Sequence, residues 1–272
     1  MTDSTPLQLP PALVKRAREF DGIPAPVRDA ATVVLLRPSA ETFELYVLKR
    51  ATTMAFGGLY AFPGGGVDPD DRPETIRQDW PERLGVPEER AHAVVGAAVR
   101  ELFEETGVLL AGRITEPDRT VCAGERSGVI SDLGSASWES DRTAVAAREL
   151  TLSELLHKRG LCLRDDLLFP WARWITPEFE PKRYDTWFFV SLLPLGQTAR
   201  DVSGESEGTT WTGPAAAYDL AMLPPTRKTV DSLLAYQKIE QVVGASSRRN
   251  AATPVMPRVE LTDDGGALLH LE

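Results

Sequence analysis

The chain contains few cysteines, few histidines and no long apolar run. Its two cysteines, Cys122 and Cys162, lie far apart, so they indicate neither a metal-type cluster nor a disulfide framework, which fits a reducing compartment. The three histidines, His92, His157 and His270, lack the spacing of metal ligands. The start MTDSTPLQLP lacks a secretion-signal pattern, the end HLE is no peroxisomal address, and no apolar run could span a membrane. We therefore expect a cytoplasmic protein that does not associate with membranes.

An excess of basic residues is also missing. The formal net charge is -10 at pH 7 and the isoelectric point is about 5.0. Such a chain has no general positive field for a nucleic-acid backbone, although a local basic pocket is compatible with it. Apolar residues make up 42% of the 272 positions, which is enough for one large domain or for a domain with an elaborate insertion.

The first part of the chain predicts a helix and then strands. We expect a short helix in PALVKRAREF and a β-hairpin of ATVVLL and FELYVLKR joined at RPSAET. Pro63 and the glycines Gly64, Gly65 and Gly66 should interrupt regular structure and form a turn. The polar stretch TIRQDWPERLGVPEER, with two prolines, is interpreted as an irregular insertion.

The second part begins with the strongest helical pattern, AHAVVGAAVRELFEETG, which has an apolar stripe and Gly107 as its C-cap. Residues 111–135 show no period and are expected to be loop or poorly ordered. ESDRTAVAARELTLSELLHKRG is expected to be helical, as one helix or as two pieces. A second pair of strands is expected in WARWITP and TWFFVSLLP, and a late helix in TRKTVDSLLAYQKIEQVV. This mixed order predicts an α/β or α+β domain with helices packed on a sheet.

Three glutamates share one face of that strong helix. Glu101, Glu104 and Glu105 stand at i, i+3 and i+4, so their charges repel and require a positive partner. Carboxylates beside an open glycine turn offer the hard oxygen ligands that Mg²⁺ or Mn²⁺ prefers. We therefore expect a metal ion here, with Arg100 placed to hold Glu104 through its i, i+4 spacing.

The segments GGGVDPDD and RELFEETGV together resemble the Nudix box, G-x5-E-x7-R-E-U-x-E-E-x-G-U, of the Nudix hydrolases. The second half matches at every constrained position from Arg100 to Val108. In the first half, Asp71 stands where the family has Glu if Gly65 is the motif glycine, and the interval to Arg100 is longer than in the family. We therefore expect a loop inserted inside the box. Asp71 is equally suited to two roles, as a residue of a turn or as a metal ligand.

Outside the box, LKRATTMAFGGLYAFPGG, WARWITP, PKRYDTWFFV and LPPTRKTVDSL are similar to the branch with a split box that includes a peroxisomal coenzyme A diphosphatase. The coenzyme A signature of that branch has two arginines. Here Arg50 is present, and Met54 lies near the place of the other one. The resemblance implies a Nudix α/β/α sandwich with a mixed sheet and inserted helical segments. We expect an N-terminal extension at 1–30, the Nudix domain at 31–244 with insertions near 72–92 and 111–170, and a tail at 245–272.

The resemblance also implies a set of site residues. Expected catalytic residues are Arg100, Glu101, Glu104 and Glu105. The expected ligands of Mg²⁺ or Mn²⁺ are Glu101, Glu104, Glu105, Gly65 and Glu205. Glu205 and its neighbour Glu207 are also candidates for a general base, or else exposed loop acids. Arg50 and Arg183 could bind phosphate or form structural ion pairs. The tryptophans Trp171, Trp174, Trp187 and Trp211 fit the core better than a base-stacking surface.

Two functions of different class follow. The first is metal-dependent hydrolysis of a pyrophosphate bond in a small nucleoside-diphosphate-linked molecule such as coenzyme A or acyl-CoA, as the intact Arg100, Glu101, Glu104 and Glu105 favour. The second is a Nudix-fold nucleotide-binding or regulatory module without turnover, as the split box and Asp71 favour. General nucleic-acid binding is not expected, and the oligomeric state is open.

Overall fold

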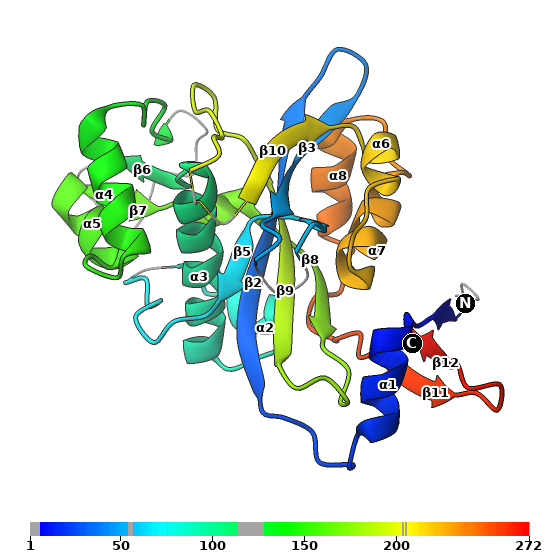
Figure 1. Ribbon diagram of the computed structural model, residues 1–272. Helices are drawn as coiled ribbons and strands as arrows, with labels where there is room; N and C mark the ends of the chain where they lie inside the picture. Colours follow the sequence, from blue (N-terminus) through cyan, green and yellow to red (C-terminus); the bar gives the residue numbers. More distant parts are fainter. Residues whose placement is uncertain are drawn as a thin grey trace.

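A mixed sheet forms the centre of the computed structural model, which describes residues 6–53, 57–74, 76–113, 128–202, 204 and 206–271 (Figure 1). Its seven strands run in the order β10-β3-β2-β9-β8, with β4 paired to β3 and β5 paired to β2. Their bounds are β2 Val27–Pro38, β3 Phe43–Arg50, β4 Tyr60–Ala61, β5 Gly64–Gly66, β8 Leu168–Ile175, β9 Arg183–Leu192 and β10 Ser206–Thr212. Strands β2 and β9 are parallel, whereas β3 and β5 are antiparallel to β2.

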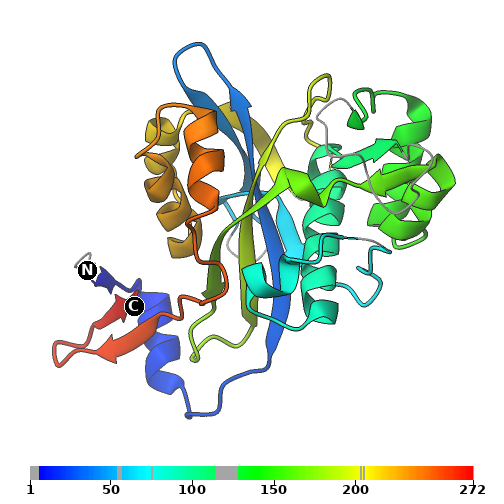
Figure 2. The same ribbon diagram turned by 180° about the vertical axis from the view of Figure 1, so that it is seen from behind.

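Helices cover both faces of this sheet, as Figures 1 and 2 show from opposite sides. On one face lie α2 Trp80–Leu84 and α3 Glu88–Thr106, and on the other α6 Pro214–Tyr218, α7 Pro224–Leu233 and α8 Ile239–Ser246. Val33 and Leu35 of β2 pack toward α3, while Val34 and Leu36 pack toward α7 and α8. Both faces of β2 are therefore buried, which explains its continuous apolar run. The predicted α/β sandwich with a mixed sheet is confirmed.

Several predicted elements are present. Helix α1 spans Pro11–Glu19, the hairpin forms from β2 and β3, and β8 pairs with β9 as the second pair of strands. The long helical pattern is α3, and Gly107 ends it in the left-handed conformation with φ 72°. The following helical segment forms two pieces, α4 Ala136–Ala146 and α5 Leu152–Arg159.

Three expectations about local structure were wrong. The three glycines form the short strand β5 rather than a turn, because they pair with Ala30, Ala31 and Thr32 of β2. The insertion that was expected to be irregular contains helical structure towards its C-terminal end. Trp80 and Leu84 of α2 are fully buried in the core there, and α3 already begins at Glu88. The expected late helix is divided into α7 and α8.

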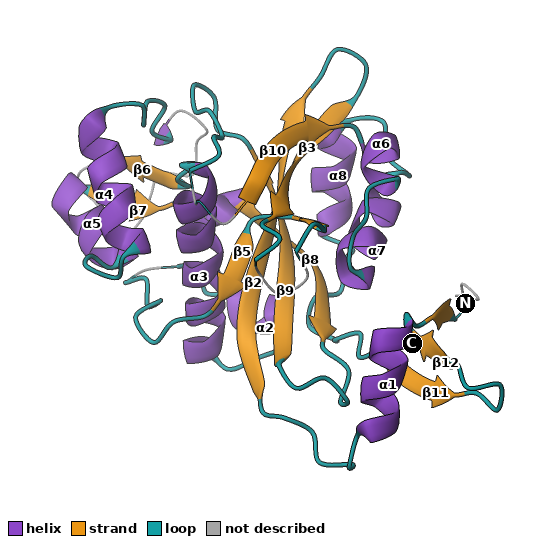
Figure 3. Cartoon of the chain, in the orientation of Figure 1, coloured by secondary structure: helices purple, strands orange, loops and turns teal. Residues whose placement is uncertain are grey.

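The inserted segment after α3 forms a separate lobe, on the left of Figure 3. It contains α4 and α5 with a two-stranded sheet of β6 Ala111–Arg113 and β7 Leu161–Leu163, followed by the 3-10 turn η2 Asp165–Leu167. Residues 114–127, which fall in the stretch expected to be loop, lie outside the described residues. Cys162 of β7 is disulfide-bonded, contrary to the expectation of reduced cysteines, and Cys122 lies outside the described residues.

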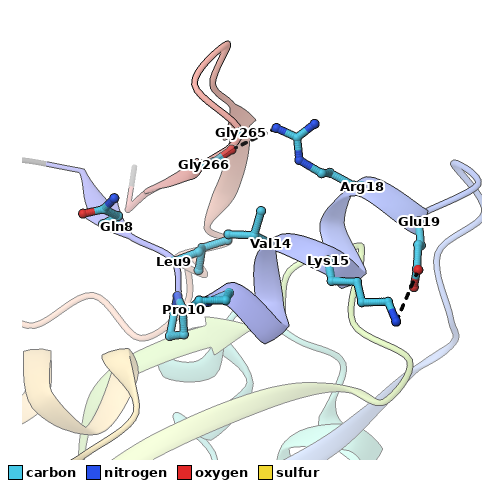
Figure 4. Close-up of a pocket in the computed structure, with 10 residues that line it drawn as sticks. Gln8, Leu9, Pro10, Val14, Lys15, Arg18, Glu19, Gly265 and Gly266 are labelled. Atoms are coloured by element: carbon cyan, nitrogen blue, oxygen red, sulfur yellow. Dashed lines mark hydrogen bonds and ion pairs between the residues drawn. The ribbon is translucent and has the colours of Figure 1, made fainter.

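The two ends of the chain lie together. Strand β1 Leu7–Gln8 pairs with β12 Ala267–His270, which also pairs with β11 Arg258–Leu261, so the segment expected as a tail contains a hairpin. Between this sheet and α1 lies a surface pocket of about 770 Å³, lined by Leu9, Val14 and Arg18 among others (Figure 4). Among the described residues, no helix is long and apolar enough to cross a bilayer.

Candidate active site

The candidate site lies at the C-terminal half of α3. The predicted apolar stripe, Val95, Ala98, Val99 and Leu102, is fully buried. At the other end of the helix, Arg90 donates to Asp29 of β2 and to Asp185 of β9. The stripe and this ion-pair network attach α3 to the sheet in one rotational orientation. Glu101 and Glu105, which border the stripe, therefore face strand β5.

Each of the three glycines of β5 contacts one charged side chain of α3. The Gly64 amide donates to Glu105 Oε2 at 2.8 Å. A Cβ atom on Gly65 would lie only 2.5 Å from Glu101 Oε1, so the carboxylate packs directly against the bare backbone. The Gly66 carbonyl accepts a hydrogen bond from Arg100 Nη2 at 2.8 Å. The two halves of the motif, far apart in the chain, therefore meet here.

Arg100 is the central cation of the site. Its Nη1 donates to Glu101 Oε1 at 2.7 Å and to Glu104 Oε1 at 3.1 Å, as the i, i+4 spacing predicted for Glu104. Its Nε and Nη2 donate to the two carboxylate oxygens of Asp71 at 2.7 and 2.9 Å. The Arg100 side chain is only 4% exposed, so these carboxylates supply its compensating charge.

Asp71 is thus the acid that pairs with Arg100. It also shapes the turn, because its Oδ2 accepts from the Asp68 amide at 2.8 Å. The residues after Asp71 pack against α3 at Gly96. A Cβ atom on Gly96 would lie 3.0 Å from Pro73 and 3.1 Å from the Asp71 carbonyl oxygen. Because Gly96 has no side chain, the first residues of the insertion can pack closely against α3 while Asp71 stays bonded to Arg100.

Further arginines surround the end of α3, and sequence reasoning did not find them. Arg148 Nη1 donates to Glu104 Oε1 at 2.7 Å and its Nε lies 2.7 Å from Asp68 Oδ2. Arg142 donates to the Glu104 backbone carbonyl, and the Arg200 amide donates to the Thr106 carbonyl. Positive charge at a helix C-terminus also offsets the helix dipole. Arg142 and Arg148 come from the inserted lobe, and no spacing in the sequence links them to α3.

We call the carboxylates of Asp68, Asp71, Glu101, Glu104 and Glu105 the acid cluster. Burial raises the pKa of Glu101 to about 7, although the adjacent Arg100 acts in the opposite direction. Burial also raises the pKa of Glu104, against the effect of Arg100 and Arg148. For Arg100, burial favours the neutral form, but the hydrogen bond to Asp71 and the charges of the two glutamates outweigh it and raise the pKa. Desolvation of the glutamates is therefore only partly compensated by the arginines.

The donor set suits a hard divalent cation, since it consists of carboxylate oxygens beside the Gly65 backbone. In the conformation described, however, the described residues contain no group of three acidic, histidine or cysteine side chains that could hold a metal ion. The positive charge that the glutamates require is supplied by Arg100 and Arg148. Metal binding would therefore need a rearrangement in which Glu104 exchanges a guanidinium contact for the cation.

The two arginines predicted to bind phosphate lie on different strands of the sheet. Arg183 does not reach the acid cluster, because its buried guanidinium donates to the backbone carbonyls of Thr176 and Ala25. Arg50 ends β3, where its backbone bonds with Gly58 and Leu59.

The late acid Glu207 has its partners outside the acid cluster. Glu205 lies outside the described residues. Glu207 of β10 forms an ion pair with Lys49 at 3.1 Å and accepts from the Thr52 amide at 3.0 Å. Of the tryptophans, Trp171, Trp174 and Trp187 are buried in the core, while Trp211 is partly exposed and packs edge-on against Tyr46.

Comparisons with known proteins agree with this geometry. No protein-family model matches the chain. It is 27% identical over 236 residues to the human acyl-coenzyme A diphosphatase NUDT19, covering 70% of this chain and 59% of that protein. It is 28% identical over 206 residues to nudix hydrolase 7 of Caenorhabditis elegans, covering 73% of this chain and 57% of that protein. The chain thus spans less than two thirds of the length of either relative.

A solved structure is similar over a larger share. The Nudix hydrolase from Alicyclobacillus acidocaldarius superimposes with a TM-score of 0.64 at 28% identity, covering 84% of this chain and 98% of that one. The fold, the glycine strand and the charged helix therefore agree with the motif resemblance. The chain therefore resembles the Nudix hydrolases and, among them, the branch that includes the acyl-coenzyme A diphosphatases.

Proposed function

We propose that this protein hydrolyses the pyrophosphate bond of a nucleoside-diphosphate-linked small molecule with the help of Mg²⁺ or Mn²⁺. The observation that carries the proposal is the contact of the three β5 glycines with Glu105, Glu101 and Arg100. This contact unites both halves of the motif in a buried, charged site. The similarity to a human acyl-coenzyme A diphosphatase and to a bacterial Nudix hydrolase supports the same reaction class.

The chemistry of a diphosphate explains why such residues are needed. A bound divalent cation would neutralise phosphate oxygens that otherwise repel the nucleophile, and it would lower the pKa of an attacking water. In the proposed site, Glu101, Glu104 and Glu105 hold the cation and Gly65 offers its carbonyl. Arg100, fixed by Asp71, orients Glu101 and Glu104 toward it. Glu101 is also a candidate general base, since it is the most buried of the three glutamates.

Coenzyme A or an acyl-CoA is the proposed substrate. The similarity to the human acyl-coenzyme A diphosphatase supports it, and the branch-level segments around the box point the same way. Arg50 remains the candidate phosphate contact, and Met54, near the place of the branch's second arginine, lies outside the described residues. Loss of that cation should weaken binding of the 3′-phosphate. Cleavage of coenzyme A should give 3′,5′-ADP and 4′-phosphopantetheine.

Chromatography of reaction products tests this proposal. The purified protein is incubated with Mg²⁺ or Mn²⁺ and, in parallel, with coenzyme A, an acyl-CoA, ADP-ribose and NADH. Formation of 3′,5′-ADP from coenzyme A or acyl-CoA is the expected result. AMP from ADP-ribose or NADH without any 3′,5′-ADP would reject the coenzyme A assignment and leave the hydrolase assignment intact.

A binding module without turnover is the second candidate. The observation that favours it is the pairing of Glu104 with both Arg100 and Arg148, which leaves no ready metal group among the described side chains. Such a module should bind a nucleotide in calorimetry yet release no product in the assay above with either metal. Measurable turnover would exclude it.

A further inference from the structure

We propose that Arg148 is an exchangeable counter-ion of the acid cluster. Its guanidinium holds Asp68 and Glu104 together when no metal is bound, and a divalent cation displaces it from Glu104. This inference rests on the proposed function, because it assigns Glu104 to metal binding. It adds a positioning role for a residue that lies outside the motif.

The contacts place Arg148 between two carboxylates from different parts of the chain. Asp68 follows β5, and Glu104 belongs to α3. Arg148 reaches both, at 2.7 Å in each case. Glu104 Oε1 additionally accepts from Arg100 at 3.1 Å, so a single oxygen receives two guanidinium contacts. That oxygen becomes available to a cation only when one of the two arginines withdraws.

Exposure decides which arginine can withdraw. The Arg100 side chain is 4% exposed, whereas the Arg148 side chain is 50% exposed. Removing Arg100 from its partners would leave a buried charge uncompensated, which is costly. Arg148 can instead move into water, where its charge is solvated and the lost ion pairs are weak. Arg148 is therefore the contact that yields.

The backbone at Arg148 is also unusual. Its φ is 61°, and within the described part of the chain it is the one non-glycine residue with positive φ. It directly follows Ala147, the C-cap of α4, and so occupies the next position, at which glycine is usually preferred. The Arg148 amide donates to Val145 and the Glu149 amide to Ala144, which ends the helix at this residue. An arginine in a position suited to glycine is consistent with a requirement for its side chain.

The decisive measurement is the affinity for Mn²⁺ alone, from the electron paramagnetic resonance signal of the free ion. Arg148→Gly suits this test because glycine adopts the same φ without strain, so the end of α4 is preserved. We expect Arg148→Gly to bind Mn²⁺ roughly threefold to tenfold more tightly than wild type, since the competing cation is gone. Arg148→Lys keeps the charge but loses the planar two-point contact. Its affinity for Mn²⁺ should therefore lie between those of wild type and Arg148→Gly.

Lys158→Ala is the matched control. Lys158 belongs to the same inserted lobe, is 58% exposed and pairs with Asp141 rather than with the acid cluster. Its removal changes the net charge equally and should leave Mn²⁺ affinity within about twofold of wild type. Mn²⁺ should raise the Tm of Arg148→Gly by more than it raises the wild-type value.

The outcomes separate this inference from the proposed function. Equal or weaker Mn²⁺ binding by Arg148→Gly would overturn the exchange role of Arg148 and leave metal binding itself intact. An equal gain in Lys158→Ala would also overturn it, because net charge alone would then explain the effect. Failure of every variant and of wild type to bind Mn²⁺ would overturn both.

Discussion

Both carboxylate oxygens of Asp71 accept hydrogen bonds from the guanidinium of Arg100, 29 residues further along the chain, at 2.7 and 2.9 Å. Asp71 stands where the family motif has Glu, and the chain between the two residues is longer than in the motif. The insertion therefore lengthens the connection without separating the partners. Helix α2 and the first turns of α3 occupy the added length.

Asp71→Asn should destabilise the fold and impair the site. The change removes the charge that compensates the buried Arg100, and loss of one partner of a buried ion pair costs about 3 to 5 kcal/mol. Urea denaturation should show this loss, whereas Asp70→Asn, at the exposed neighbouring position, should change the free energy of unfolding by less than about 0.5 kcal/mol. Equal stability of the two variants would contradict a structural role for the Asp71 and Arg100 pair.

Glu105→Gln should abolish most turnover while the fold survives. Glutamine keeps the shape, and its side-chain oxygen can still accept from the Gly64 amide, but a negative ligand charge is lost. We expect turnover to fall by about two orders of magnitude or more, with unchanged circular dichroism. Glu149→Gln, an exposed glutamate outside the acid cluster, is the charge-matched control. Near wild-type activity of folded Glu105→Gln would remove Glu105 from the proposed ligand set.

Gly65→Ala tests the close approach of β5 to α3. The added Cβ would lie 2.5 Å from Glu101 Oε1, so the carboxylate must move. A shift of about 1 Å in such a group can reduce turnover about a hundredfold, and we expect a loss of that order with the fold retained. Gly66→Ala, where the nearest atom to a Cβ is 4.0 Å away, should cost far less. Similar activity of both variants would argue against a constrained Glu101.

Adding Mg²⁺ or Mn²⁺ should raise the melting temperature. A ligand that binds only the native state at about 100 times its dissociation constant adds about 2.7 kcal/mol, which corresponds to several degrees for a chain of this size. Differential scanning fluorimetry with saturating metal and then with EDTA measures the shift. A triple variant with glutamine at positions 101, 104 and 105 should show no shift. The same melting temperature for wild type in metal and in EDTA would count against a metal site.

The sequence by itself determined the α3 helix, its buried stripe and its end at Gly107. These features follow from local periodicity and capping, which are encoded by residues one to four positions apart. Strands β2, β3, β8 and β9 were predicted for the same reason, whereas β10 was not predicted. The three glycines were misinterpreted as a turn, because they form a strand only by pairing with β2. A side chain at Gly65 would also collide with Glu101 of α3, and a contact between such distant residues cannot be read from local sequence.

The contact of Arg100 with Glu104 was predicted from its i, i+4 spacing, but the rest of the charge balance of the site was decided by the tertiary structure. The motif indicated that the glutamates need a positive partner, and we expected a metal ion. The fold supplies Arg100 from the same helix and Arg148 from the inserted lobe, 44 residues beyond Glu104. Arg183, equally cationic in the sequence, is held by backbone carbonyls instead. Residue type reveals which charges exist, but only packing places a given charge beside its partner, because contacts between distant segments leave no local periodic signal.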